Sequence, residues 1–394
     1  MAGVDRAIDP IERPSIVGQR DWHAENVGAL RRWRRLAGFG RWLIVGVARH
    51  VGVIFAASSG QRAGKRSRLP SMARALITGI AGQDGSYLAE RLLADGYEVI
   101  GFDLAASASE ARNLAEIAGQ IEYIAGDLLE VGSLRSAIAA READEIYHLA
   151  APTFVPDSWE DPSSTMAAIV GSTSEILAAA LEATTRPKVW VSASAEVFGD
   201  TDCSPQNEDS AMRPRSPYGV AKLAALGLVR TMREHHGLFA CGGILYNHES
   251  PRRPPHFLPR KVTRGAAAIA LGQQDELVLG DLTAVRDWSD ARDIVGAIVL
   301  AMRAGQPSDY VLASGQGRTV KELVRAAFAA AGIPELVEAS IRVDPAFVRP
   351  PELIAPIGDA SRAERELDWK REISFEQMIA EMVETDLAEL RSAS

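Results

Sequence analysis

The stretch that decides the fold reads ALITGIAGQDG and runs from Ala75 to Gly85. It opens on an apolar run, which is typical of a buried parallel strand, and continues with three glycines, Gly79, Gly82 and Gly85. Glycines allow a tight turn and a close approach of a pyrophosphate, and the helix that follows offers free N–H groups and the positive end of its dipole. The stretch therefore predicts a dinucleotide-binding turn, with a glycine-rich turn that binds no ligand as the alternative.

Outward from this stretch, strands and helices alternate along the chain. Strands are expected over 75–78, 97–102, 121–124, 145–149, 188–192 and 240–246, and helices over 86–94, 166–182 and 221–235. This alternation predicts an α/β fold with a doubly wound parallel Rossmann sheet.

The alternation of strands and helices is interrupted after Asn247. Residues 251–259 hold four prolines and are expected to form a loop, and helices are expected over 261–271, 290–304, 320–331 and 375–390. We therefore predict an NAD(P)-binding domain over 72–246 and a smaller C-terminal α/β lobe over 247–394 that binds the substrate. The pattern leaves open whether elements around 286–312 return to the first domain.

Composition narrows the class of protein. The net charge of −9 argues against a general nucleic-acid partner. The two cysteines, Cys203 and Cys241, have neither a metal-ligand spacing nor a disulfide pattern, so no metal is expected. Their scarcity favours a reducing, cytoplasmic compartment.

Residues 1–71 form a basic N-terminal extension with 13 Lys and Arg against 5 Asp and Glu. Its apolar stretch, Trp42 to Ser58, is too short to span a membrane, carries Arg49 at its middle and lies too far from the start for a signal peptide. Three explanations stand: an amphipathic arm that touches a membrane or a partner, a disordered basic tail, or a start-site artefact. We favour the artefact, because Met72 leads directly into the first strand; no membrane contact is expected for the body.

Carboxylates at two strand ends indicate the kind of dinucleotide. Asp103 ends the second strand, 24 residues after Gly79, where it would accept hydrogen bonds from the adenosine ribose and repel a 2′-phosphate. This favours NAD over NADP. Asp127 and Leu128, after the third strand, are placed to meet the adenine, although an Asp capping the next helix fits nearly as well.

Four polar residues predict acid–base chemistry. Tyr218 and Lys222 lie four residues apart, so on a helix they share one face, and the ammonium group would lower the pKa of the phenol and hold the cofactor ribose. Ser194 and Glu196 follow the strand over 188–192, at the edge of the sheet where ligands bind in such folds. Ser194 can bond the reacting oxygen, and Glu196 adds an acid–base group beyond what hydride transfer alone needs.

The glycine pattern followed by Tyr218-x-x-x-Lys222 resembles the extended short-chain dehydrogenase/reductase family, and further runs resemble GDP-mannose 4,6-dehydratases over about residues 72–390. Those runs are Gly79–Glu90, Arg215–Tyr218, Asn247–Arg253, Arg260-Lys261, Arg286–Trp288, Arg349–Glu352 and Gly358-Asp359.

The resemblance implies a reaction in three steps on GDP-mannose. Tyr218 takes the O4 proton while C4 gives hydride to the nicotinamide, Glu196 removes the C5 proton as water leaves from C6, and the hydride returns to C6. The product is GDP-4-keto-6-deoxymannose. The alternatives are a nucleotide-sugar 4-ketoreductase or epimerase of the same fold, which would not need Glu196 as a base, and a catalytically silent NAD-binding protein.

The expected site follows from the motifs and the resemblance together. Catalytic residues are Ser194, Glu196, Tyr218 and Lys222; cofactor-binding residues are Gly79, Gly82, Gln83, Asp84, Gly85, Asp103, Asp127, Leu128, Ala150, Tyr218, Lys222, His248 and Arg253; substrate-binding residues are Asn247, Lys261, Arg286, Arg349 and Glu352. The partners implied are a GDP-sugar and a second copy of the chain, as a homodimer through the helices that bear Tyr218 or as a homotetramer.

The sequence departs from the family pattern at three places. Ser194-Ala195-Glu196 stands where the family has Thr-Ser-Glu, so Glu196 or a bound water would supply the proton for the departing water. The run from Asp103 to Ala106 replaces two arginines that serve NADP and the tetramer in the family, which usually uses NADP. Pro254-Pro255 replaces the usual Gly-Glu.

Overall fold

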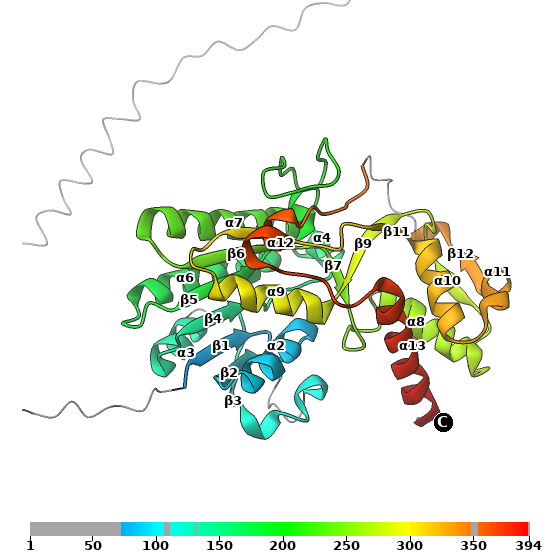
Figure 1. Ribbon diagram of the computed structural model, residues 1–394, viewed down its shortest axis with the longest axis horizontal. Helices are drawn as coiled ribbons and strands as arrows, with labels where there is room; N and C mark the ends of the chain where they lie inside the picture. Colours follow the sequence, from blue (N-terminus) through cyan, green and yellow to red (C-terminus); the bar gives the residue numbers. More distant parts are fainter. Residues whose placement is uncertain (1–71, 106–110, 131, 348–353, 393–394) are drawn as a thin grey trace, which may run out of the picture. The chain divides into compact units, whose positions relative to one another are not determined.

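A seven-stranded sheet lies at the centre of the computed structural model (Figure 1). Its strands are β1 (Arg74–Thr78), β2 (Glu98–Asp103), β3 (Glu122–Ala125), β4 (Glu145–His148), β5 (Lys188–Ser192), β6 (Ala240–Leu245) and β10 (Asp309–Leu312). They are all parallel and lie in the order β10-β6-β5-β4-β1-β2-β3. The predicted doubly wound parallel α/β fold is confirmed.

The structure describes residues 72–105, 111–130, 132–347 and 354–392. The expectations for residues 1–71, and those for Arg349 and Glu352, fall outside these ranges.

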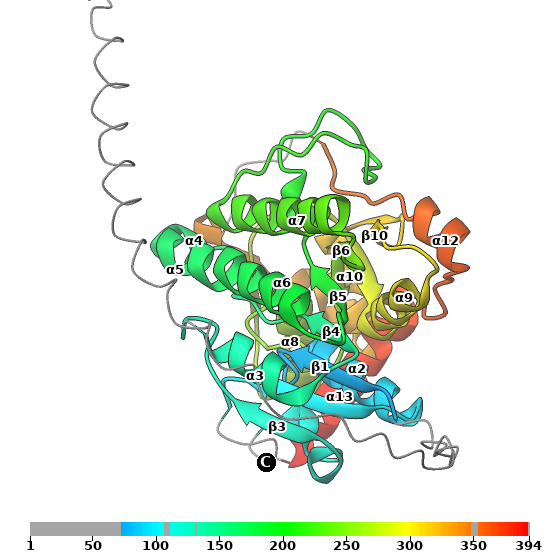
Figure 2. The same ribbon diagram turned by 90° about the vertical axis from the view of Figure 1, so that its left-hand side faces the viewer.

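Helices cover both faces of the sheet, as Figure 2 shows. On one face, α2 (Gln83–Ala94), α9 (Ala291–Arg303) and α12 (Ser361–Leu367) enclose one apolar cluster with the strands. On the other face lie α3 (Ser133–Arg141), α6 (Ser172–Glu182) and α7 (Pro217–His236), which enclose a second cluster. Strands buried from both sides read as continuous apolar runs, which is why they were recognisable in the sequence.

The strand register brings the predicted site residues to one edge of the sheet. Thr78 pairs with Phe102 on β2 and with His148 on β4, so the residues that follow all three strands meet there. The order of connection reverses between β1 and β4, and ligands of open α/β sheets bind in the crevice at such a point.

Several helices begin earlier than their apolar periodicity indicated, among them α2 and α7, which carry predicted cofactor-binding and catalytic residues. The start of α2 lies at Gln83 rather than residue 86, directly after the glycine turn. The start of α7 lies at Pro217 rather than residue 221, because the Ser216 side chain accepts a hydrogen bond of 3.0 Å from the Gly219 N–H and proline suits the first turn. Tyr218 and Lys222 therefore lie on one helix.

A second, smaller group of elements follows β6. Its strands are β7 (Asn247–Glu249), β8 (Leu277–Leu279), β9 (Val285–Asp290), β11 (Gly317–Thr319) and β12 (Ile341–Val343), and its helices are α8 (Leu258–Ala270), α10 (Val320–Ala330), α11 (Val337–Ser340) and α13 (Phe375–Ser392). The core between α8, α10 and α13 includes Trp288, Phe328 and Met382. Between β9 and β11 the chain supplies α9 and β10 to the large sheet, so the large sheet also draws on residues beyond 246.

Shorter segments complete the described chain. They are α4 (Asp157–Glu160), α5 (Pro162–Met166), the π-type turn η3 (Ala167–Gly171), and the 3-10 turns η1 (Arg112–Leu114), η2 (Ala118–Gln120), η4 (Ala195–Val197), η5 (Pro334–Leu336) and η6 (Pro345–Phe347). Within the described ranges, Pro162–Glu182 is the one helical segment long and apolar enough to cross a membrane by length and composition, and 50% of its most apolar window is buried inside the fold.

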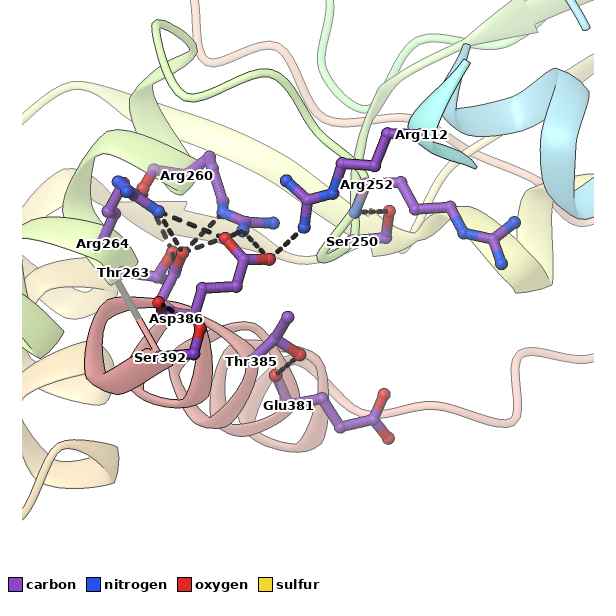
Figure 3. Close-up of polar contacts among 11 residues, drawn as sticks. Arg112, Ser250, Arg252, Arg260, Thr263, Arg264, Glu381, Thr385, Asp386 and Ser392 are labelled. Carbon is purple, nitrogen blue, oxygen red and sulfur yellow. Dashed lines mark hydrogen bonds and ion pairs between the residues drawn. The ribbon is translucent and has the colours of Figure 1, made fainter. Parts of the chain in front are cut away.

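The C-terminal helix is fixed to α8 by buried charges, which Figure 3 shows in detail. Asp386, whose side chain is fully buried, accepts hydrogen bonds from Arg260 at 2.9 Å and from the Thr263 hydroxyl at 2.8 Å. Glu389 pairs with Arg260 at 3.3 Å and also with Arg112, from the segment between β2 and β3. Residues at the end of the chain thereby hold α8, which carries Lys261.

We expect the substitution Asp386→Asn to destabilise the protein by about 3 kcal/mol, because it leaves the buried guanidinium of Arg260 short of a counter-charge. Chemical denaturation of the full-length protein measures this difference. The matched control is Glu276→Gln, which alters an exposed pair with Arg342 and should leave the unfolding midpoint nearly unchanged. Equal midpoints for the two variants would show that the buried pair does not brace α8.

Candidate active site

The glycine turn after β1 is built by contacts that exclude side chains. A Cβ atom on Gly79 would lie 2.8 Å from the backbone nitrogen of Ala150, and one on Gly85 would lie 2.1 Å from the Gly79 carbonyl oxygen. Gly79 also has a φ of +74°, a value that favours glycine. Gly82 caps α2 and offers no side chain to its N–H groups. The first turn of α2 is therefore open to an anion, as expected for a pyrophosphate site.

Asp103 lies against this turn. Its two carboxylate oxygens accept hydrogen bonds from the N–H groups of Ala81 at 2.8 Å and Leu104 at 2.7 Å. Asn113 donates to the Ala81 carbonyl at 3.0 Å and closes the other side of the turn. Each Asp103 oxygen keeps a further lone pair, so the carboxylate can still accept from a ribose diol.

Asp127 and Leu128 follow β3 at the same edge of the sheet. The Asp127 carboxylate accepts a hydrogen bond from the Leu129 N–H at 2.9 Å, and its carbonyl accepts one from the Ser133 hydroxyl at 3.0 Å. Asp127 thus orders its own loop. The N-cap of α3 is Gly132, so the alternative of an Asp that caps the next helix is wrong.

The structure brings the four predicted catalytic residues together. The Lys222 ammonium donates to the Ser192 carbonyl at the end of β5 at 2.8 Å, which fixes α7 on the strand. Ser194 caps the turn η4 by accepting from the Glu196 N–H at 3.2 Å. The charge of Glu196 and the side chain of Ser194 both act on Tyr218.

The titration of Tyr218 and Lys222 differs from the prediction. Burial raises the pKa of Tyr218 to about 12, and the Ser194 side chain and the charge of Arg253 only partly oppose this. Burial also lowers the pKa of Lys222 to about 8. The expectation that Lys222 lowers the pKa of the phenol is therefore wrong for the described residues, because the loss of water around the buried phenol dominates.

His248 and Asp84 were predicted to bind the cofactor, and in the structure they bind each other. The imidazole Nε2 lies 2.8 Å from the Asp84 carboxylate, and Nδ1 lies 2.7 Å from the Tyr246 carbonyl. Gln83 donates to the His248 carbonyl at 3.1 Å and accepts from the Ser250 hydroxyl at 2.9 Å. These contacts join the start of α2 to β7.

Arg253 lies beside a residue that the sequence analysis did not single out. Glu249, at the end of β7, is fully buried, and its carboxylate lies 3.2 Å from Nε of Arg253. The guanidinium carbon of Arg253 lies 3.7 Å from the centre of the Phe257 ring. The run Asn247–Arg253 contained the signal, because it holds an acidic residue and an arginine on either side of Pro251, and a turn there can bring the two together.

The predicted substrate residues are dispersed over the second lobe. Asn247 is exposed at the start of β7, and its partner on β9 is Trp288, two residues after Arg286, so both predicted residues lie on adjacent strands. Arg286 donates to the Val285 carbonyl at 2.6 Å. Lys261 is half-buried in the first turn of α8.

Two buried residues that support the site were also missed. The His148 ring lies 2.8 Å from the Thr78 hydroxyl and 2.9 Å from the Ser172 hydroxyl; burial and then the charge of Lys222 lower its pKa to about 3, so it is neutral. Thr78 in turn accepts from the Ala150 N–H at 3.2 Å, beside the glycine turn. Asp287 is buried and receives three backbone N–H groups, from Ser314, Gly315 and Gly358. A histidine within an apolar strand was the available signal for His148.

The pair of His248 and Asp84 should make stability depend on pH. Burial lowers the pKa of His248. The charge and hydrogen bond of Asp84, with the hydrogen bond to the Tyr246 carbonyl, together raise it by more, so the pKa lies above the ordinary 6.5. The contribution of the charged His248 to the stability of the fold is therefore complete below pH 6.5, and it is lost as the pH rises through the raised pKa of His248. Burial raises the pKa of Asp84, but the charge and hydrogen bond of His248, with the hydrogen bond from Gln83, together lower it below 3.8, so the pair persists in mild acid.

We expect the stability advantage of the wild type over His248→Gln to be larger at about pH 6 than at about pH 9, as measured by thermal unfolding at each pH. The control is His235→Gln, which changes an exposed imidazole on α7. An advantage over His248→Gln that stays constant across this range would contradict the charged pair.

Comparisons with known proteins agree with this geometry. A family model described as GDP-mannose 4,6 dehydratase matches residues 76–382. The GDP-mannose 4,6-dehydratase of Yersinia enterocolitica is 38% identical over 356 residues, covering 81% of this chain and 95% of the relative. GDP-mannose 4,6 dehydratase 2 of Arabidopsis thaliana is 39% identical over 329 residues, covering 79% of this chain and 86% of the relative.

Solved structures share the fold. The dTDP-glucose 4,6-dehydratase DesIV of Streptomyces venezuelae, solved with NAD bound, matches with a TM-score of 0.71 and 26% identity, over 81% of this chain and 98% of DesIV. RMD of Pseudomonas aeruginosa, complexed with NADPH, matches in fold with a TM-score of 0.68 and 24% identity, over 81% of this chain and 100% of RMD. The matched span from 76 to 382 includes the glycine turn, Tyr218 and Lys222, and the chain belongs to the GDP-mannose 4,6-dehydratase family.

Proposed function

We propose that this protein catalyses the 4,6-dehydration of GDP-mannose, which gives GDP-4-keto-6-deoxymannose and water. The relatives described above are named for that enzyme. The observation that carries the proposal is Glu196, a second acid–base group that acts on Tyr218 from the turn after β5. A reaction that only transfers hydride needs no second base, whereas removal of the C5 proton does.

The glycine turn fits a nicotinamide dinucleotide. Gly79 and Gly85 leave no room for a Cβ, α2 begins without a side-chain cap, and Asp103 borders the turn. A bound nicotinamide would supply an acceptor for the hydride from C4 and give it back at C6. The residues proposed to hold the cofactor are Gly79, Gly82, Gln83, Asp84, Gly85, Asp103, Asp127, Leu128, Ala150, Tyr218, Lys222, His248 and Arg253.

Tyr218 is the proposed base for the sugar O4 hydroxyl, and Ser194 the group that bonds the same oxygen. Lys222 holds the nicotinamide ribose from the same face of α7. Deprotonation of Tyr218 near neutral pH requires its pKa to fall from about 12, and Ser194 and Arg253 already act in that direction. The buried Lys222 ammonium, 5.7 Å from the centre of the Tyr218 ring, adds a positive charge nearby.

Glu196 is the proposed base for C5, whose proton is acidic beside the C4 carbonyl. The electron pair of the C5–H bond forms the C5–C6 double bond, the C6–O bond breaks, and the hydroxyl leaves with a proton as water. Ala195 has no polar side-chain group for that proton, so we assign the proton to Glu196 or to a water beside it. Hydride then joins C6 and a proton joins C5, and net oxidation is zero.

The lobe over 247–394 is proposed to hold the GDP part of the substrate through Asn247, Lys261 and Arg286. Cationic side chains suit the diphosphate oxygens. The resemblance adds Arg349 and Glu352 to this set, the latter for the ribose diol.

A second copy of the chain is the proposed partner. Trp159 on α4, Met166 on α5 and Val220 on α7 are large apolar side chains that are exposed, and α5 packs beside α7. Burying such side chains against their equivalents would stabilise a homodimer through the helix that bears Tyr218, and a homotetramer would need further contacts.

The proposed compartment is the reducing cytoplasm, in which cysteines stay unpaired, as Cys203 and Cys241 are in the structure.

Incubation with GDP-mannose and an added nicotinamide cofactor should yield a nucleotide-sugar lighter by one water, without net cofactor reduction. We expect Glu196→Gln to slow this dehydration about a thousandfold while C4 oxidation persists. Mass spectrometry of the nucleotide-sugar and the absorbance of reduced nicotinamide follow the two steps.

The control for this variant is Asp200→Asn, an exposed carboxylate four residues further on that pairs with Arg215. Nearly wild-type turnover of a nucleotide-sugar by the Glu196 variant would favour the 4-ketoreductase or epimerase alternative.

We also propose NAD as the preferred cofactor. Removing the negative charge of Asp103 relieves the repulsion of a 2′-phosphate, so Asp103→Ala should raise kcat/KM with NADP relative to NAD by about tenfold or more. Steady-state kinetics with each cofactor measure the ratio, and Asp202→Asn is the control because it changes an exposed carboxylate that pairs with Arg213, outside the proposed cofactor site. A wild type that prefers NADP would contradict the assignment.

A further inference from the structure

Glu249 has no role in the steps above, although it pairs with Arg253, one of the proposed cofactor residues. Neither Glu249 oxygen accepts a hydrogen bond from the residues that the structure describes, although the side chain is only 1% exposed. A buried carboxylate with so little compensation is costly, and its nearest charge is the Arg253 guanidinium at 3.2 Å. The structure therefore retains Glu249 chiefly through this one contact.

The guanidinium of Arg253 is held from a second side. The guanidinium carbon lies 3.7 Å from the centre of the Phe257 ring. Phe257 in turn makes an edge contact with Phe154, with ring centres 5.8 Å apart. The ion pair fixes the Nε edge and the ring fixes one face, so the terminal nitrogens are the part of the group left to meet a ligand. A guanidinium in a fixed plane suits the bidentate binding of phosphate oxygens.

The charge of Arg253 reaches both ends of the proposed cofactor site. At the start of α2, burial raises the pKa of Asp84, but the charge and hydrogen bond of His248, a hydrogen bond from Gln83 and the charge of Arg253 together lower it. At the catalytic end, burial raises the pKa of Tyr218, and Arg253 opposes that rise. Contacts place Arg253 at the start of α2 as well. Its N–H donates to the Ser250 carbonyl at 3.0 Å, and the Ser250 hydroxyl donates to Gln83 at 2.9 Å. The diphosphate of a dinucleotide would lie at this helix start.

We propose that Glu249 is a positioning residue, which holds the Arg253 guanidinium so that its terminal nitrogens meet the diphosphate of the bound dinucleotide. The inference rests on the proposed function only for the presence of a dinucleotide, and it does not depend on the sugar.

Orientation and charge predict opposite effects of removing the carboxylate. If Glu249 acted only as a negative charge near the phosphates, its loss would relieve repulsion and tighten binding. If it orients Arg253, its loss weakens the binding of ligands that carry a diphosphate. If it only stabilises the fold, ligands with and without phosphate weaken together.

The experiment titrates the full-length protein with ADP-ribose and with adenosine. We expect Glu249→Gln to weaken ADP-ribose binding about threefold to tenfold and Arg253→Gln about tenfold to a hundredfold, with adenosine affinity unchanged in both. In the double variant the Glu249 substitution should have no further effect, because its action passes through Arg253. Tighter ADP-ribose binding by Glu249→Gln, a parallel loss for adenosine, or full additivity would each overturn the proposal.

Two further variants keep the test independent of folding defects. Asp309→Asn removes a buried carboxylate paired with Arg233 at 2.9 Å, and we expect it to lower stability without changing the ratio of the two affinities. Glu249→Asp keeps the charge but shortens the side chain. It should therefore lower the affinity for ADP-ribose relative to that for adenosine, even if Glu249→Gln does not fold. An unchanged ratio of the two affinities would overturn the proposal. An inactive protein that still shows these ratios would refute the dehydratase assignment alone, whereas a wild type that binds ADP-ribose no better than adenosine would refute both.

Discussion

The approach of Gly85 to the carbonyl oxygen of Gly79 is the constraint on which the rest of the site depends. With no space for a Cβ between them, α2 can begin directly beyond β1 only because residue 85 is glycine. The early start of α2 carries Asp84 to His248, and so connects the large sheet to the second lobe. The same turn places a backbone N–H on Asp103. The link to the second lobe and the position of Asp103 thus depend on one backbone contact.

Burial has a larger influence than neighbouring charges on the protonation of His148, Tyr218 and Lys222, whereas at His248 and Asp84 the neighbouring groups prevail. It keeps His148 neutral, raises the pKa of Tyr218 to about 12 and lowers that of Lys222 to about 8. Charges in such surroundings interact strongly because little water screens them. A ligand that brings charge to this edge of the sheet will therefore change the pKa values of the groups around it. Exclusion of water likewise strengthens the effect of Arg253 on the pKa of Tyr218.

The sequence was sufficient for features that depend on local pattern. The strand over 188–192 was predicted with both its ends. The glycine turn, Asp103 and Ser194 were placed after strands, and Tyr218 and Lys222 were predicted to share one face of a helix. The short polar strands β7 and β9 escaped notice because their residues read as charged loop. The pKa of Tyr218 was predicted in the wrong direction, since spacing reveals a neighbouring cation but not the depth of burial. Glu249 was missed for a similar reason. What sets it apart is a buried carboxylate that accepts no hydrogen bond from the described residues, and a sequence shows neither burial nor missing partners.

The place of β10 at the edge of the large sheet has a consequence for biosynthesis. The chain leaves this sheet after β6, builds β7, β8 and β9, and only then returns to pair β10 with β6. A nascent chain that has just emerged as far as β6 can pair this strand with β5, but the other edge of β6 stays exposed until residue 312 has left the ribosome. Chaperones that bind extended apolar segments would find their target in this interval, and a chain truncated within it would be prone to aggregate rather than to fold as an independent half.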